Sequence, residues 1–372
     1  MNRMKILVIE GRRTIGGGQV ITKDVCETLS TNHSVSVFLP GDNRTPISKF
    51  LSTYKQYYFD VREYKRGKKS ILDYFGFIYN TYAVGRALFS VMRKEKFDLL
   101  YMQHLSMLPI VVAVNLLFHT KMIAHVHVVY TDKRARWLVN KMLRNKSIVK
   151  VIGVSNFCLS QFLGLDKNKC RIVFNPVVSL PPVQNPNSEV CNIAVVGDVC
   201  MSKGQHVLLK ALAGKGRKYK VHIIGNIIDT QYKDYLDKQF PNVNHVYTGM
   251  IADVAGYMKD NSVVVVVVVS VVGFETFSLA MVEAWGMGIP TIATNDFGMK
   301  ELVNKFLPKY SEKVLFPLGD SEALYQRLEE LLSNKDLYDE FSKQAWDVVN
   351  TQLNYHNFST RINQIIEEIS YD

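Results

Sequence analysis

Residues 263–294 read VVVVVVVSVVGFETFSLAMVEAWGMGIPTIAT, and this stretch decides the fold. It opens with seven consecutive valines, Val263–Val269, which a helix tolerates poorly and which suit a central strand of a parallel sheet. A helical segment follows, and Gly288-Ile289-Pro290 then leads into a second strand at Thr291–Thr294. A strand, a helix and a strand in this order predict a parallel sheet with a crossover helix.

The same alternation runs through the rest of the chain. Further strands are predicted at Lys5–Glu10, Ser34–Leu39, Leu99–Met102, Met122–Val128, Lys150–Val154, Asn192–Val196 and Val221–Ile224. Helices are predicted at Gln19–Thr31, Ile71–Lys94, Ser155–Leu163, Gln205–Ala213, Asp320–Leu332 and Tyr338–Ile369. A Pro-, Ser- and Asn-rich stretch from Asn175 to Ser188 separates two halves as a linker. The fold class is therefore α/β, with two Rossmann-like domains facing across a cleft.

The expected domains are residues 1–180, residues 181–345, and a C-terminal helix at 346–372 that packs back on the first domain. The length of 372 residues agrees with two domains. Five scattered cysteines without a C-x-x-C pair exclude a disulfide scaffold and disfavour a zinc site. The apolar run Ile6–Ile9 is too short for a signal peptide, and Leu105–Phe118 is too short to span a membrane. We therefore expect a cytoplasmic protein.

Positive charge is concentrated in the first half of the chain. Residues 1–180 hold 28 Lys and Arg against 11 Asp and Glu, a net charge of +17, whereas residues 181–372 carry −6. The basic clusters are Arg62–Lys69, Arg93–Lys96 and Lys133–Lys150, and the last has Trp137 and Leu138 among its charges. This amphipathic basic pattern suits an anionic membrane surface or an anionic acceptor. Solvated helix faces and nucleic acid are the alternatives.

Three segments carry residues suited to phosphate and sugar binding. Gly16-Gly17-Gly18 follows the first strand, where glycines let backbone amides approach a ligand, although a tight turn explains them equally well. Lys203 ends a glycine-bounded loop after the first strand of the second half and is either a diphosphate-binding cation or a surface lysine. Glu275 and Glu283 form an E-x7-E pair around a helix expected to begin near Phe277. Its first amides are free to bind phosphate, and Glu283, two turns in, can accept both hydroxyls of a ribose. The alternative is a helix cap and a solvent-facing glutamate.

Together these segments resemble the retaining glycosyltransferases of family 4 (GT4), which share the GT-B fold. The strongest likeness lies in residues 273–303, GFETFSLAMVEAWGMGIPTIATNDFGMKELV. The other matching segments are the glycine loop at Gly16–Gly18, Phe174-Asn175-Pro176-Val177, Lys203-Gly204 and Val246-Tyr247-Thr248-Gly249. The resemblance covers most of the chain.

The resemblance implies a role for individual residues. Glu283 would bind the ribose, Glu275 the hydroxyls of the donor sugar, and Lys203 the phosphate. The remaining donor-binding residues would be Gly17, Gly18, Ile251 (with Met250, beside the base), Thr276, Phe277, Ser278 and Leu279, the last three through backbone amides on the diphosphate. His127 would lie near the transferred sugar and act in catalysis with Glu275 and Lys203, while His125 and His104 are rivals. Asp198 departs from the family, which usually has an arginine there, and its carboxylate would repel a diphosphate.

The implied reaction is transfer of a hexose from a UDP- or GDP-sugar, with retained anomeric configuration, to a glycan or lipid-linked acceptor. No D-x-D pair occurs in the chain, so we expect no metal and no cofactor beyond the nucleotide-sugar substrate. A role in bacterial surface polysaccharide or lipopolysaccharide assembly, peripheral to the inner face of the cytoplasmic membrane, fits the basic half. A sugar-nucleotide epimerase and a non-catalytic GT-B subunit are the alternatives. Nucleic-acid binding rests on charge alone and is not expected.

Overall fold

The computed structural model describes residues 3–61, 71–182, 190–215, 219–271 and 275–371. The chain forms two compact units: unit 1 is Met1–Phe174 with Phe358–Asp372, and unit 2 is Asn175–Asn357. The first boundary thus lies at residue 174 and not at 180, because Asn175–Leu180 belong to unit 2; of the tail, only the part from Phe358 joins unit 1. The basic cluster Arg62–Lys69, the linker beyond Pro182, and Gly273 and Phe274 lie outside the described residues.

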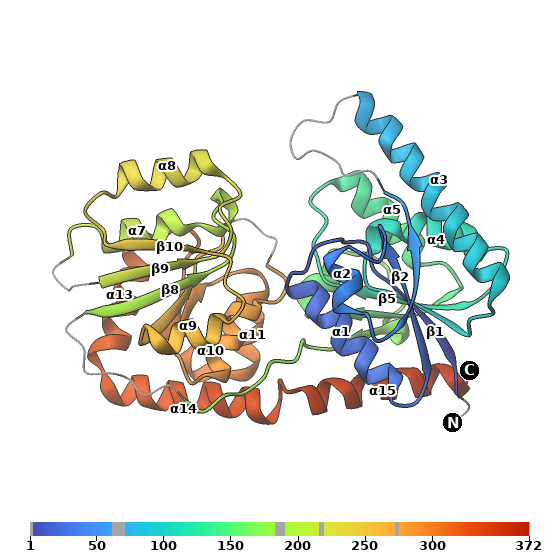
Figure 1. Ribbon diagram of the computed structural model, residues 1–372. Coiled ribbons are helices and arrows are strands. Elements are labelled where there is room, and N and C mark those ends of the chain that lie inside the picture. The colour runs from blue at the N-terminus through green and yellow to red at the C-terminus, as the bar shows by residue number, and fades with distance from the viewer. Residues whose placement is uncertain (1–2, 62–70, 183–189, 216–218, 272–274, 372) are drawn as a thin grey trace. The chain divides into compact units, whose positions relative to one another are not determined.

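Unit 1 contains a seven-stranded parallel sheet in the order β3-β2-β1-β4-β5-β6-β7. Strands β1, β2 and β5 are labelled in Figure 1. Its strands are β1 (Lys5–Ile9), β2 (Ser34–Pro40), β3 (Lys55–Phe59), β4 (Leu99–Met102), β5 (Lys121–Val126), β6 (Ile148–Gly153) and β7 (Cys170–Ile172). Residues Ile6–Ile9 are fully buried because both faces of β1 are covered, which explains the unbroken apolar run. The strand order reverses between β1 and β4, the position at which α/β sheets bind ligands.

The helices of unit 1 are α1 (Gly17–Ser30), α2 (Pro46–Phe50), α3 (Ile71–Lys94), α4 (Leu108–Asn115), α5 (Lys133–Leu143), α6 (Asn156–Ser160) and most of α15 (Tyr355–Tyr371), with short 3-10 turns η1 (Leu105–Met107) and η2 (Lys167–Lys169). Helix α15 is fixed to the sheet by polar contacts. Arg171 lies 2.7 Å from Glu368, and Lys121 Nζ donates to the carbonyl of Ile369 at 2.8 Å. Most of the C-terminal helix α15 therefore packs in the same unit as the N-terminal strands.

Unit 2 contains a six-stranded parallel sheet in the order β10-β9-β8-β11-β12-β13, which repeats the reversal of unit 1 between β8 and β11. Its strands are β8 (Cys191–Val196), β9 (Tyr219–Ile224), β10 (His245–Gly249), β11 (Val263–Val268), β12 (Thr291–Thr294) and β13 (Leu315–Phe316). Its helices are α7 (Gln205–Leu212), α8 (Thr230–Gln239), α9 (Val254–Asp260), α10 (Leu279–Gly286), α11 (Phe297–Phe306), α12 (Ser311–Val314), α13 (Ser321–Ser333) and α14 (Lys335–Thr351), with 3-10 turns η3 (Met201–Lys203) and η4 (Pro308–Tyr310).

The valine strand β11 is buried along its whole length, in the centre of the unit 2 sheet. On one face Val265 and Val267 pack with apolar residues of α7, α8 and α13. On the other, Val263 and Val266 pack with residues of α9 and α10. Each buried valine contributes about 1.5–3 kcal/mol relative to an exposed one, so an all-valine strand between two helical layers is strongly favoured.

The strand and helix predictions are largely confirmed, and the differences have local causes. The short edge strands β3, β7 and β13 were not predicted. Helix α6 ends at Ser160 and not at Leu163. The basic segment Lys133–Lys150 contains a helix only as far as Leu143, because β6 begins at Ile148. The tail is not helical throughout: α14 ends at Thr351, and α15 starts at Tyr355.

Candidate functional site

The loop between β8 and α7 is held against the end of β11 by a glycine. Gly204 has φ 70° and ψ 20°, and a Cβ atom there would lie 2.0 Å from the carbonyl oxygen of Val269. Only glycine permits both this left-handed conformation and this close approach. The side chain of Lys203 passes over Gly197, where an added Cβ would lie 3.3 Å from Lys203 Cε. The loop therefore directs Lys203 across the carboxyl ends of β8 and β11.

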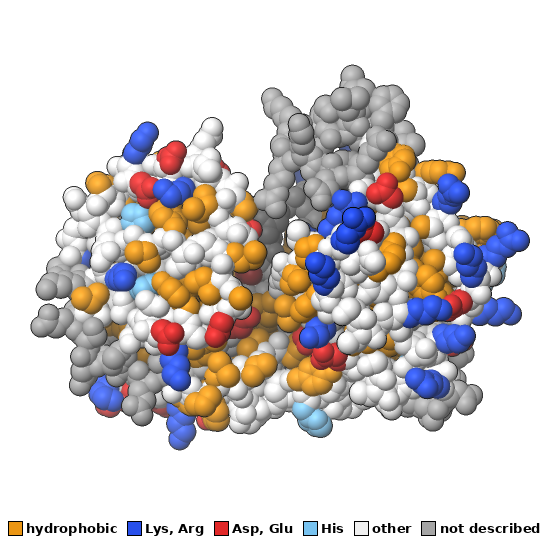
Figure 2. All heavy atoms as spheres, in the orientation of Figure 1, with side chains coloured by type: hydrophobic (Ala, Val, Ile, Leu, Met, Phe, Trp, Pro, Cys, Tyr) orange, Lys and Arg blue, Asp and Glu red, His pale blue; other side chains and the backbone are white. Residues whose placement is uncertain are grey.

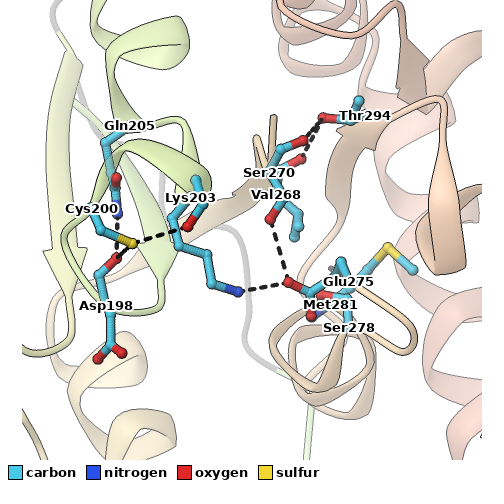
Figure 3. A network of polar contacts seen from close by, with 11 residues as sticks. Asp198, Cys200, Lys203, Gln205, Val268, Ser270, Glu275, Ser278, Met281 and Thr294 are labelled. Atoms are coloured by element: carbon cyan, nitrogen blue, oxygen red, sulfur yellow. Dashed lines mark hydrogen bonds and ion pairs between the residues drawn. The ribbon is translucent and has the colours of Figure 1, made fainter. Parts of the chain in front are cut away.

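Lys203 forms an ion pair with Glu275, and Figure 3 shows the two side chains pointing toward one another. Lys203 Nζ lies 2.6 Å from Glu275 Oε2, and Ser270 Oγ donates to the same oxygen at 3.3 Å. The lysine side chain is 34% exposed and the glutamate 16%, so the pair is partly screened from water. Two of the residues predicted for catalysis thus meet in the structure, one from each side of the strand reversal.

The backbone at Glu275 is fixed from a second direction by α11. The amide of Gly298 donates to the carbonyl of Glu275 at 2.9 Å. A Cβ atom on Gly298 would lie 2.2 Å from the carbonyl oxygen of Thr276, so the first turn of α11 packs directly on this segment. The position of the Glu275 carboxylate is therefore set by three separate elements of unit 2.

Helix α10 begins at Leu279, two residues later than expected. Ser278 is its N-cap and accepts a hydrogen bond from the amide of Met281 at 3.4 Å. Thr276, Phe277 and Ser278 are buried, whereas Leu279 and Ala280 are half-buried. Within the described part of the chain, the amides of Leu279 and Ala280 have no hydrogen-bond acceptor. The amides open to an anion are thus those of the first helical turn, where the helix dipole also favours negative charge.

Glu283 lies on the second turn of α10 with its side chain exposed to solvent. Partial desolvation by the surrounding protein raises the pKa of its carboxyl group. The helix that carries it is fixed by Trp285, which is fully buried and donates from Nε1 to Thr291 Oγ1 at 2.8 Å. An accessible carboxylate on a rigid helix can accept two neighbouring hydroxyl groups of a ligand.

Asp198 does not neutralise Lys203. In Figure 3 its carboxylate points away from the Lys203–Glu275 pair, and its backbone carbonyl accepts from Gln205 Nε2 at 3.0 Å. The Asp198 carboxylate would still repel an anion that binds nearby, but Lys203 forms its ion pair with Glu275 and not with Asp198. The structure thus leaves the Lys203 cation paired only with Glu275 among the described carboxylates.

Met250 and Ile251 follow the end of β10, at the same edge of the unit 2 sheet. Met250 is 72% exposed, and Ile251 is half-buried against the core around α9. The carbonyl of Gly249 accepts from the amide of Gly225 at 3.0 Å, which ties this turn to the end of β9. The two residues offer an accessible apolar surface at the strand ends.

In unit 1, Gly17 and Gly18 form the exposed start of α1, with Gly16 as the N-cap. Gly16 has φ −153°, which any residue can adopt, and a Cβ on Gly18 would meet no described atom within 4 Å. Neither a positive φ angle nor close packing therefore explains why Gly16 and Gly18 lack side chains. The buried Glu10, at the end of β1, holds the adjacent loop by accepting from the amides of Gly11 and Arg12.

The three histidines named from sequence are not equivalent. His127 follows β5 and is half-buried, with Nε2 2.6 Å from Gln103 Oε1. Burial and the neighbouring His104 lower the pKa of His127 to about 4, so its ring is neutral at physiological pH. His125 is fully buried, with its ring centroid 4.2 Å from that of His127, and cannot meet a ligand. His104 is half-buried and packs against Gly11.

Sequence reasoning missed Ser270, Glu10 and Gln103 as site residues. Glu10 and Gln103 follow β1 and β4, which flank the strand reversal of unit 1, and Ser270 lies just beyond β11, which flanks the strand reversal of unit 2. Their position at the end of a predicted strand or directly after it was the available signal. Among the described residues, no group of three His, Cys, Asp or Glu side chains could hold a metal ion.

The comparisons with known proteins agree with this architecture. Residues 15–178 match the family described as Glycosyltransferase Family 4, and residues 181–347 match Glycosyl transferases group 1. The two matches together span most of the chain, which therefore belongs to the group 1 glycosyltransferases and has the GT-B fold. No curated protein matched the sequence.

Solved structures share the whole fold at low sequence identity. Anabaena HepE in complex with UDP-glucose has a TM-score of 0.80 and 17% identity, with 100% of both chains covered. A glycosyltransferase from Rickettsia africae has a TM-score of 0.79 and 18% identity, also over 100% of both chains. Sucrose-phosphate synthase from Thermosynechococcus elongatus has a TM-score of 0.80 and 15% identity, covering 99% of this chain and 100% of its own.

Proposed function

We propose that this protein transfers a hexose from a UDP- or GDP-sugar to a glycan or lipid-linked acceptor, with retention of the anomeric configuration. The observation that carries the proposal is the Lys203–Glu275 ion pair beside the open amides of Leu279 and Ala280. A cation and helix amides suit a diphosphate, and a carboxylate suits sugar hydroxyls. Glu283, on the next turn of α10, would accept the ribose hydroxyls.

In the proposed reaction the bond between the anomeric carbon and the diphosphate oxygen breaks, and the acceptor oxygen bonds to the same face of that carbon. The acceptor proton passes to the leaving phosphate oxygen. Lys203 would leave Glu275 for the diphosphate and stabilise its developing charge with the α10 amides, which frees Glu275 for the sugar. His127, whose ring is neutral, would contact the sugar without adding charge. The proposed reaction uses no metal, in keeping with the lack of a D-x-D pair.

The donor base is proposed to be uracil or guanine, bound beside Met250 and Ile251. The complexes of Anabaena HepE with UDP and with UDP-glucose support a nucleotide-sugar donor for this fold. Lipopolysaccharide enzymes such as the galactosyltransferase WaaB are among the structural relatives, which supports a role in surface polysaccharide assembly in the cytoplasm. Among the described helices, none is both long and apolar enough to cross a bilayer.

The decisive experiment is calorimetric titration with UDP and with GDP, in EDTA. We expect one nucleotide to bind and K203M to weaken that binding about 10- to 100-fold, because a hydrogen bond to a charged group contributes about 1.5–3 kcal/mol. K210M, which removes an exposed lysine of α7, is the matched control and should bind normally. Release of free UDP or GDP from a sugar nucleotide that carries the bound base, in the presence of an acceptor, would then support transfer. An isomerised sugar nucleotide would indicate an epimerase.

A non-catalytic GT-B subunit is the second candidate, and Asp198 is the observation that favours it. Its carboxylate stands in the loop that would approach the diphosphate. If neither nucleotide binds the parent protein but D198R restores binding, the phosphate site has been disabled by this one residue. Binding by the parent protein would reject this candidate.

A further inference from the structure

Helix α5 turns its most apolar surface residues toward solvent. Val139 and Leu143 pack inward, and the opposite side carries Arg134, Trp137 and Leu138. The outward positions continue with Lys141 and Arg144, at the three- and four-residue spacing that places side chains on one helical face. We call Arg134, Trp137, Leu138, Lys141 and Arg144 the α5 stripe. Trp137 is 63% exposed and Leu138 37%, so the apolar part of the stripe is not covered by unit 1 itself.

A neighbouring turn extends the apolar surface of the α5 stripe. The carbonyl of Leu163 accepts from Asn140 Nδ2 at 3.2 Å and from Arg144 NH2 at 2.6 Å. These two bonds hold the turn after α6 beside the C-terminal half of α5. The side chain of Leu163 is 75% exposed there. The surface therefore combines an indole and two leucines with cations on the same helix.

The charge of this surface has one sign. Between Lys133 and Leu143 the helix holds four Lys and Arg and no Asp or Glu. Lys141 Nζ lies 5.3 Å from the centroid of the Trp137 ring, so cation and indole form one unit. Over unit 1 more widely, the charged side chains on the face visible in Figure 2 are mostly Lys and Arg. The surface is thus complementary to an extended negative charge.

We propose that the α5 stripe and Leu163 bind the surface of an anionic lipid membrane. Lysine and arginine are attracted to anionic headgroups, and tryptophan is favoured at the boundary between headgroups and hydrocarbon. A soluble anionic glycan or a nucleic acid satisfies the cations but offers no apolar layer for Leu138 and Leu163. The inference concerns unit 1 alone and does not depend on the proposed transferase reaction.

The chain provides its own fluorescent reporter of this binding. It has three tryptophans: Trp285 is fully buried, Trp346 is half-buried and donates to the carbonyl of Leu180, and Trp137 is exposed. Vesicles of phosphatidylglycerol and phosphatidylcholine should shift the emission of the full chain to shorter wavelength, and pure phosphatidylcholine should not. W137F should abolish the shift. An unchanged spectrum with anionic vesicles would overturn the proposal.

Vesicle sedimentation tests the role of charge. R134Q/K141Q should partition about 30-fold more weakly, because each cation near an anionic surface adds about 1 kcal/mol, or about fivefold. K210Q/K238Q removes two exposed lysines of unit 2 and is the matched control. Both double variants should keep the parent unfolding temperature. Equal weakening by the two double variants would show attraction by net charge and refute the assignment to α5. An emission shift produced by an RNA oligonucleotide but not by vesicles would refute membrane binding.

Discussion

Replacement of Gly204 by alanine tests the close packing that positions Lys203. Gly204 has φ 70°, and an added Cβ would lie 2.0 Å from the carbonyl oxygen of Val269. Gly214 has nearly the same conformation, φ 71°, but no described atom lies within 4 Å of its added Cβ. G214A should therefore cost only the left-handed conformation, about 1–2 kcal/mol. G204A should cost about 2 kcal/mol more, because the backbone of β11 or of the loop must move.

The assay is thermal unfolding followed by tryptophan fluorescence in a W137F background. The two remaining tryptophans, Trp285 and Trp346, then both report unit 2. For a domain of this size, about 2 kcal/mol lowers Tm by about 4–8 °C, which is the expected difference between G204A and G214A. G204A should also weaken nucleotide binding, whereas G214A should not. Equal Tm values for the two variants would mean that the loop does not pack on Val269, and the positioning argument would fail.

Partial desolvation raises the pKa of Glu283, so the folded chain binds this proton more tightly than the unfolded chain. The free energy of unfolding therefore falls as pH rises through the ordinary glutamate range. E283Q should therefore stabilise unit 2 at neutral pH and have no effect when the carboxyl is protonated, as measured by urea unfolding at two pH values. The pKa of His127 is lowered from 6.5 to about 4, so the free energy of unfolding should fall as pH drops through this range. H127Q should make this fall smaller by about 3 kcal/mol, measured by urea unfolding across an acid titration. S270A removes one hydrogen bond to Glu275 and should slow transfer roughly tenfold in a diphosphate-release assay with nucleotide affinity unchanged; a loss of affinity instead would assign Ser270 to folding of the loop.

Patterns within one segment were readable from the sequence. The valine strand and the helix after it follow from burial on both faces and from periodicity, and both are present as β11 and α10. The edge strands β7 and β13 could not be predicted, since they are three and two residues long and carry no periodic signal. The helix start was misplaced because Phe277 and Ser278 are apolar or small and continue the pattern, whereas the cap hydrogen bond to Met281 fixes Ser278 as the boundary.

Relations between distant segments required the structure. Lys203 and Glu275 were each named from sequence, but their 2.6 Å contact depends on β8 and β11 being neighbours. No local pattern encodes that pairing. His127 and His125 are two residues apart and look alike in sequence, yet His125 lies within β5 and is fully buried, whereas His127 lies just beyond the end of the strand and is half-buried. The direction of Asp198 likewise depends on the loop conformation around it.

The chain leaves unit 1 at Phe174 and returns to it at Phe358, so unit 2 is inserted within unit 1. The returning segment is essential to the packing of unit 1, because Ile362, Ile365, Ile366 and Ile369 are all buried. During synthesis, every residue of unit 2 leaves the ribosome before the last segment of unit 1 does. Unit 2 can therefore complete its core first, whereas the core of unit 1 remains incomplete until the last turns of α15 have been synthesised.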